Sequence, residues 1–354
     1  MIKNLLLTVL AISTCFNLFS QDEEKIKAFF EKGVRLHDAG KYKEAIQSYN
    51  KILEIDKNNI VAYAEIAMSY TAMEDYKTAI KFCRKAIKAK PNSRRLANVY
   101  VQLGTCYDLL GNGKRAIKSY DKGLELFPNF YMLHFNKGVT QINLKDYEGS
   151  IKSFQQSMRL KPTHPSSHYY LGMIEIELNH KIPAILALSR FLVLENNTKR
   201  SAYAGQYIRR LLGSYATENE DGSISINLSG DFMEEKKGNS FSMIDMQLSL
   251  SAALQVTANK TLEDSLGVKM TKAEKFLTFY DLLCDNLDES KKEEGFYWKY
   301  YVPYFLDMKA QEHTRVMAHL VHLHMKDNTY VNEWFEENEA AIDNFSKWTS
   351  AFEW

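Results

Sequence analysis

The sequence predicts an all-α protein: a solenoid of stacked helix pairs, then a mainly helical C-terminal domain with at most a short β-hairpin. The first observation is a pattern that returns about every 34 residues from Phe29 onward, which is typical of helix-hairpin repeats. The second is that the pattern ends near Gly213, after which apolar residues keep helical spacing without a repeat. The chain therefore divides into residues 1–20, a repeat region over 24–213 and a C-terminal region over 214–354.

The first 20 residues are predicted to be a secretory signal peptide. Lys3 precedes an apolar run over residues 5–12, and Ser20 provides the small residue at the cleavage point. We expect the mature protein to begin at Gln21 and to be periplasmic or secreted. A competing interpretation makes Cys15 the acylated residue of a lipoprotein, which the threonine directly before it disfavours.

Each repeat is expected to contain two antiparallel helices that approach closely. Small residues occupy the contact points: Gly33, Ala67, Gly104, Gly138 and Gly172 in the first helices, and Ala45, Ala79, Ala116, Ser150 and Ala184 in the second. Pro91, Pro128 and Pro162 end second helices, because proline lacks the backbone donor that a helix interior needs. Such a repeat buries its apolar face only against neighbouring repeats, so the units must stack.

These residues resemble the tetratricopeptide repeat family. Five units are expected, over residues 26–59, 60–93, 97–130, 131–164 and 165–198. Residues 94–96 are an insertion between the second and third units, and residues 199–212 are expected to form a sixth first helix or a capping helix. The resemblance implies a non-enzymatic fold that binds a protein partner.

In this family the first helices line the concave surface of the solenoid. The resemblance therefore implies an apolar partner-binding groove formed by Val61, Ala64, Met68, Val101, Met132, Phe135, Val139, Ile142, Tyr169, Met173 and Ile176. Phe30 and Val34 stand where some relatives carry the lysine and asparagine that hold a terminal carboxylate, so that ligand class is disfavoured. The occupant is either an amphipathic segment of a partner or the protein's own C-terminal region.

Composition is that of an ordinary globular protein, with 45% hydrophobic and 25% charged residues and a formal net charge of +1. This balance gives no overall field that favours nucleic acid or an anionic membrane. One basic patch stands out, formed by Lys77, Lys81, Arg84, Lys85, Lys88, Arg94 and Arg95. It is either a solvated face or a docking site for an acidic surface, for which residues 285–294 and 333–343 are candidates.

Three cysteines follow the signal peptide: Cys83, Cys106 and Cys284. An odd number at these spacings is not a disulfide framework. Cys83 and Cys106 lie on neighbouring predicted helices, so one disulfide bridge between them is an alternative. Burial as small packing residues is the favoured interpretation.

Several elements are expected in the C-terminal region. Residues 223–229 alternate in the manner of a short strand, and residues 241–258 have helical spacing. Thr271 and Glu274 form a capping box ahead of another helix. Pro303 either kinks an aromatic helix that begins at residue 296 or starts a new one that runs to about residue 325. The aromatic end of the chain is expected to be packed.

No catalytic motif is found. His313, His319, His322 and His324 are placed on one predicted helix, where only His319 and His322 are one turn apart and able to share a metal. We therefore predict no metal site and no cofactor. The hypothesis is an exported adaptor or assembly factor; the alternatives are a hydrolase or metal-dependent enzyme with its site in residues 214–354, and a self-associating structural protein of the cell envelope.

Overall fold

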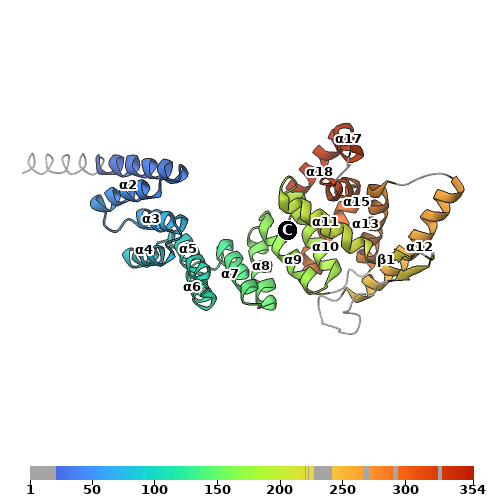
Figure 1. Cartoon of the computed structure of the whole chain (residues 1–354), viewed down its shortest axis with the longest axis horizontal. Coiled ribbons are helices and arrows are strands. Elements are labelled where there is room, and N and C mark those ends of the chain that lie inside the picture. The colour runs from blue at the N-terminus through green and yellow to red at the C-terminus, as the bar shows by residue number, and fades with distance from the viewer. Residues whose placement is uncertain are drawn as a thin grey trace, which may run out of the picture. The chain divides into compact units, whose positions relative to one another are not determined.

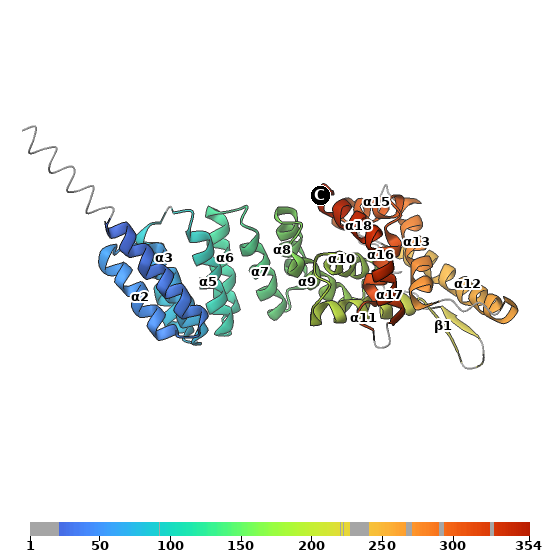
Figure 2. The same cartoon turned by 90° about the horizontal axis from the view of Figure 1, so that it is seen from above.

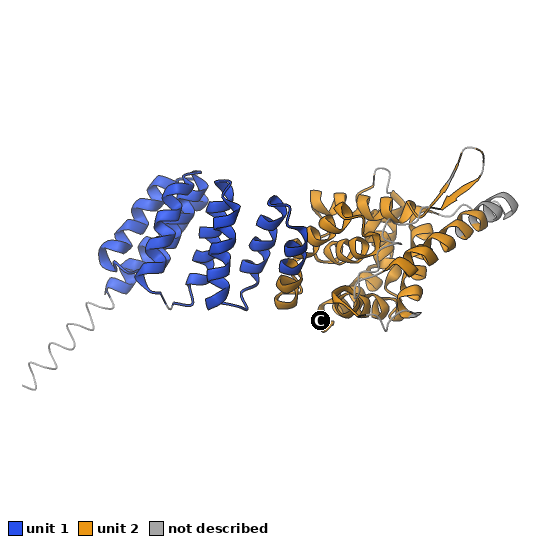
Figure 3. Cartoon of the chain, turned by 90° about the horizontal axis from the view of Figure 1, so that it is seen from below, with its two compact units in different colours: residues 1–153 blue, residues 154–354 orange. Residues whose placement is uncertain are grey.

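The computed structural model describes residues 21–91, 93–219, 221, 223–226, 241–266, 271–289, 294–325 and 329–354 (Figure 1). The predicted signal peptide and Cys15 lie outside these residues. The chain forms two compact units, residues 1–153 and 154–354, which divide within helix α8 (Figure 3). The fifth repeat is thus grouped with the C-terminal region. Among the described helices, none has both the length and the apolar character needed to cross a bilayer.

The first unit is a row of antiparallel helix pairs (Figures 1 and 2), which confirms the predicted all-α repeat fold. A helix over residues 21–38 is followed by α2 (Tyr42–Ile55), α3 (Ile60–Ala72), α4 (Tyr76–Ala89), α5 (Leu96–Leu109), α6 (Gly113–Leu126), α7 (Tyr131–Asn143) and the start of α8 (Tyr147–Leu160). Asn59, Asp75 and Asn112 cap α3, α4 and α6 by accepting a hydrogen bond from a backbone N–H of the first turn.

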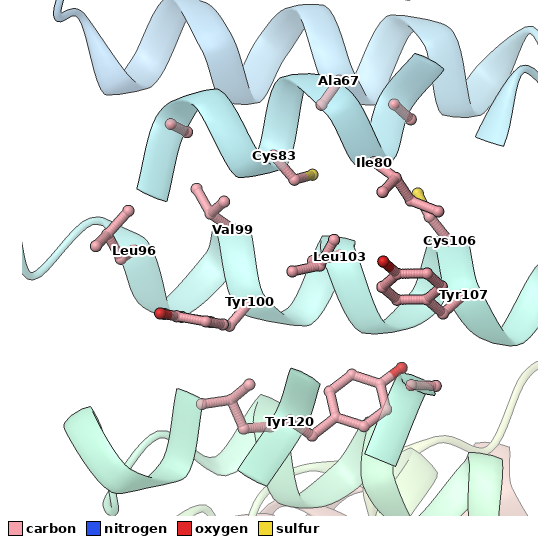
Figure 4. Packing of buried hydrophobic residues seen from close by; sticks show 14 of the residues in the cluster. Ala67, Ile80, Cys83, Leu96, Val99, Tyr100, Leu103, Cys106, Tyr107 and Tyr120 are labelled. Atoms are coloured by element: carbon pink, nitrogen blue, oxygen red, sulfur yellow. The ribbon is translucent and has the colours of Figure 1, made fainter. Parts of the chain in front are cut away.

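The small residues set how closely the two helices of a repeat approach. A Cβ atom built on Gly33 would lie 2.4 Å from the Tyr49 ring, and one on Gly104 would lie 2.2 Å from the Tyr120 ring. Both rings are fully buried, so neither has room to move away. Figure 4 shows the buried layer that continues between repeats, where side chains of α4 and α5 meet.

The turn inside each repeat has one backbone geometry. A residue with positive φ follows each first helix: Gly40 (74°), Glu74 (61°), Gly111 (71°), Lys145 (60°) and Asn179 (60°). The next backbone N–H then donates to a carbonyl five residues earlier, as between Asp75 and Tyr70 at 2.9 Å. This bond satisfies a carbonyl that the helix end leaves free. The turn therefore repeats even where glycine does not.

The second unit begins with the end of α8 and continues with α9 (Pro165–Glu177), α10 (Lys181–Leu194) and α11 (Lys199–Gly213). Strands β1 (Ala216–Glu218) and β2 (Ile224–Ile226) form an antiparallel pair in which Ala216 lies opposite Ile226. The remaining helices are α12 (Ser242–Leu266), α13 (Lys272–Glu289), α14 (Phe296–Tyr300), α15 (Val302–Ala310), α16 (Thr314–His322), α17 (Thr329–Glu337) and α18 (Glu339–Ala351).

Helix α10 is the centre of the second unit. Every residue from Lys181 to Leu192 is buried, whereas the second helices of earlier repeats keep an exposed charged face. A helix that is apolar on all sides must be surrounded by protein. Helices α9 and α11 cover part of it and α16 covers another part. The C-terminal region therefore packs on the outer face of the last repeat.

The aromatic end of the chain is packed, as predicted. Tyr304 and Trp354 flank the guanidinium of Arg190, whose Cζ lies 4.8 and 4.6 Å from the two ring centres. Arg190 is only 1% exposed and also donates a hydrogen bond of 2.6 Å to the hydroxyl of Thr349. These contacts join α10 to α15, α18 and the end of the chain.

The C-terminal elements agree with the sequence in part. The capping box is confirmed, because the Thr271 backbone N–H donates to Glu274 and the Glu274 N–H donates to Thr271. The single helix expected up to about residue 325 is wrong. Glu312 has a φ of 60°, and the His313 N–H donates to the Met308 carbonyl, so α15 ends and α16 begins. The four histidines therefore do not share one helix.

We predict opposite effects from two substitutions in the repeat turns. Gly111→Ala should lower the free energy of unfolding by about 1 kcal/mol, because its φ disfavours any Cβ although no atom lies nearby. Lys145→Gly should raise it by about the same amount, because glycine tolerates this conformation. Urea unfolding followed by far-ultraviolet circular dichroism measures both changes, and shifts of the same sign would contradict the turn argument.

Acid should destabilise the second unit. Burial lowers the pKa of His168 to about 3 and of His322 to about 4, from an ordinary value of 6.5. Below pH 6.5 the unfolded chain binds protons that the folded chain does not, so the free energy of unfolding falls from about pH 7 to about pH 3. All four tryptophans lie in this unit, so their fluorescence reports its unfolding. The fall should be smaller in His322→Gln, and equal falls would exclude this histidine.

Candidate functional site

The residues predicted to line a groove form what we call the first-helix surface. It comprises Val61, Ala64 and Met68 on α3, Val101 on α5, Met132, Phe135, Val139 and Ile142 on α7, and Tyr169, Met173 and Ile176 on α9. The structure leaves Met68 exposed, with 44% of its surface accessible, and the other ten half-buried. None of these side chains is fully buried in the repeats. Apolar groups therefore face solvent on the first helices of both units.

In the first unit, helical spacing places these side chains on one side of each helix. The spacing of Met132, Phe135 and Val139 puts them on adjacent turns of α7, so they form one stripe. Phe30 and Val34, on the helix over residues 21–38, are also half-buried and apolar. The stripe therefore offers apolar contact area, and these two positions offer no donor to a carboxylate.

In the second unit, Tyr169 is held by neighbouring helices of the repeats. Its ring centre lies 5.0 Å from that of Phe191, and the Arg200 guanidinium lies 5.3 Å from its ring. The C-terminal aromatic residues contact a different face of α9, at His168 and Glu175. Tyr169, Met173 and Ile176 keep part of their side chains exposed beside this packing.

His168 and Glu175 are the important residues that sequence reasoning missed. Nε2 of His168 donates to the Pro162 carbonyl at 2.9 Å, so Nδ1 accepts the hydroxyl of Tyr301 at 2.6 Å. Glu175 accepts a hydrogen bond from Tyr297 and lies 2.6 Å from Nδ1 of His180. The sequence did offer a signal for these contacts. A histidine and a glutamate occupy positions of the helix pair that are expected to be buried, and buried polar groups require hydrogen-bond partners.

The seven cations of the predicted basic patch are all exposed on α4 and the connection that follows it. Arg84 donates a hydrogen bond of 2.5 Å to the Tyr107 hydroxyl, and the Lys85 ammonium lies 4.5 Å from the centre of the Phe82 ring. Among the described residues, none of the seven forms an ion pair. Their charge is therefore available to an acidic partner.

The acid-rich candidates for that partner lie in the second unit. Glu333, Glu336 and Glu337 are exposed on α17, whereas Asp285 of α13 pairs with Lys309. Three surface carboxylates on one short helix are an ordinary solvated face.

The histidines of the C-terminal region make separate contacts. His319 stacks on Trp334 with 3.8 Å between ring centres, and His322 meets Phe276 edge-on at 5.2 Å. Both rings donate from Nδ1 to the backbone carbonyl four residues earlier. In the part of the chain that the structure describes, no three or more histidine, cysteine, aspartate or glutamate side chains are arranged to hold a metal ion.

All three described cysteines are buried with free thiols, so the single bridge that the sequence left open between Cys83 and Cys106 is not formed. The Cys106 sulfur lies 3.3 Å from the hydroxyl of Thr71. The interpretation of these cysteines as small packing residues is confirmed.

Comparison with known proteins supports the repeat assignment. Two family models described as tetratricopeptide repeat match residues 26–59, 59–129 and 133–164. The small glutamine-rich tetratricopeptide repeat-containing protein of Dictyostelium discoideum is 34% identical over 30% of this chain and 32% of its own length. The probable UDP-N-acetylglucosamine–peptide N-acetylglucosaminyltransferase SPINDLY of Hordeum vulgare is 24% identical over 39% of this chain and 15% of its own length.

Among solved structures, pilF of Pseudomonas aeruginosa has a TM-score of 0.48 at 20% identity, over 54% of this chain and 84% of that chain. The chain spans about a third or less of the length of the two curated relatives named above. One of those relatives is named as a transferase, so repeats of this kind occur in enzymes as well as in other proteins. Residues 26–59, 59–129 and 133–164 are therefore tetratricopeptide repeats.

Proposed function

We propose that this protein is an exported, non-enzymatic adaptor or assembly factor that binds a protein partner through the first-helix surface. The observation that carries the proposal is the incomplete burial of apolar side chains on successive first helices of the first unit, from Val61 to Ile142. A contiguous apolar patch on a protein surface commonly marks an interaction site. The family supports the same conclusion, because its repeats serve protein interaction.

Binding would be driven by removal of these side chains from water, at about 25 cal/mol for each square ångström of apolar surface buried. The methionines suit a partner of irregular shape, because their side chains are flexible and unbranched. The basic patch on α4 adds a long-range attraction that speeds encounter with an acidic partner. The first-helix surface suits an amphipathic helix or an extended segment of the partner.

Replacing apolar residues of the first-helix surface should abolish partner recovery. Met68→Asp and Phe135→Asp should each reduce recovery by about tenfold, because a carboxylate would be buried on binding. The matched control is Leu126→Asp, since Leu126 is 49% exposed on α6 and lies outside the surface. The measurement is quantitative mass spectrometry of proteins cross-linked to the tagged chain in envelope extracts.

Circular dichroism of each variant establishes that the fold is intact. Recovery that is unchanged in both surface variants, or reduced equally in the Leu126 control, would remove the first-helix surface from the mechanism.

Export should leave a product that begins at Gln21. We expect N-terminal sequencing of the mature protein from the extracytoplasmic fraction to start at this residue, because Ser20 completes the predicted cleavage point. Cys15→Ser should leave cleavage and fractionation unchanged. A product that loses its membrane association in Cys15→Ser would instead show that the chain is a lipoprotein.

A further inference from the structure

A pocket of about 460 Å³ opens at one end of the first unit. Four segments line it: the helix over residues 21–38, the end of α2, the start of α3 and the connection over residues 90–95. Its volume lies within the range of pockets that hold a ligand group. Val61 belongs both to this pocket and to the first-helix surface, so the two are continuous.

The wall of the pocket is apolar. Ile52 and Ile60 are 1% and 4% exposed and form its deeper part, while Ile26, Phe30 and Val61 are half-buried. Two polar residues also line it, but their oxygens are already engaged. Asn59 accepts the Ala62 N–H at 3.0 Å, and Ser93 accepts the Arg95 N–H at 3.3 Å. The wall therefore suits an aliphatic or aromatic side chain.

The rim of the pocket is positively charged. Lys27, Lys90 and Arg95 line it from two different segments, against one carboxylate, that of Glu23. All three cations are exposed, and among the described residues none of them forms an ion pair. Three separated cations can each attract a carboxylate. The rim therefore suits a segment with several acidic side chains better than a peptide whose only carboxylate is terminal.

Arg95 belongs to the insertion that interrupts the repeat period. The other links between repeats run over residues 56–59, 127–130, 161–164 and 195–198, whereas this link runs from residue 90 to residue 95. In the other repeats, a link of four residues is enough to stack a first helix on the second helix before it. The longer link therefore supplies a feature other than stacking, and the feature present is the cationic edge of the pocket.

We propose that this pocket binds an internal acidic segment of a protein partner, with one bulky apolar side chain inserted against Phe30 and Ile60. Carboxylates on either side of that side chain would face Lys27, Lys90 and Arg95. The inference rests on the proposed function, since it describes the part of the partner that binds at this end of the first-helix surface.

The test uses the chain from residue 21 to residue 354 and fluorescein-labelled peptides with blocked termini. In the reference peptide, aspartate and glutamate residues flank a central leucine. Fluorescence anisotropy at about 50 mM salt measures its affinity. Lys90→Glu combined with Arg95→Glu should weaken binding by at least about tenfold. The matched control combines Lys114→Glu with Lys118→Glu, which makes the same charge change at exposed positions of α6 outside both the pocket and the basic patch and should weaken binding by less than about twofold.

The peptide tests the apolar part without altering the protein. Replacing its central leucine with glycine should weaken binding by about tenfold, and replacing its acidic residues with lysines should abolish binding. A peptide with a free C-terminus and no acidic side chains should bind no better than the lysine peptide.

Three results would overturn the proposal: equal losses in the two double variants, equal affinity for the leucine and glycine peptides, or tight binding of the peptide whose only carboxylate is terminal. Met68 and Phe135 lie outside the pocket, so their aspartate variants should bind the peptide normally. If the peptides gave any of these three results while partner recovery still depended on Met68 and Phe135, peptide binding in the pocket would be refuted. The proposed function would still stand.

Discussion

The repeats depend on one steric constraint, which in three of the five is the contact between a glycine on the first helix and a large residue on the second helix. Gly33 faces Tyr49, Gly104 faces Tyr120, and Gly172 faces Leu188, with no space for a Cβ in any of the three. This contact sets the separation of the two helices, and the separation in turn decides which side chains are buried between repeats and which remain on the first-helix surface. The apolar stripe is thus a consequence of the packing.

The last repeat follows the same geometry but has a second role as the core of another unit. Its second helix, α10, carries apolar residues on the side where earlier second helices carry lysines. The C-terminal helices cover that side, and their tyrosines reach His168 and Glu175 on α9. After α11 the repeat pattern ends, and α16 and α13 contact α11 in place of a further second helix.

The period, the helix pairs and the small residues could be predicted from the sequence, because each repeat is stabilised by local contacts that recur in the chain. The packing of the C-terminal region could not, since it joins residues far apart such as Glu175 and Tyr297. The sequence of α10, which is apolar on all sides, was the one indication that other helices pack around it. The break at Glu312 was missed because glutamate rarely adopts a positive φ, and nothing in its side chain marks the turn. The eleven residues of the candidate surface were predicted from the repeat alone.

The three free thiols have a practical consequence. Cys83, Cys106 and Cys284 are fully buried, and burial raises the pKa of each, so little reactive thiolate forms near neutral pH. In the chain from residue 21 onward, a cysteine introduced at an exposed position such as Lys77 would react with a maleimide dye far faster than these three. Fluorescent or spin labels can therefore be attached to either unit at a chosen site, with the native cysteines left in place.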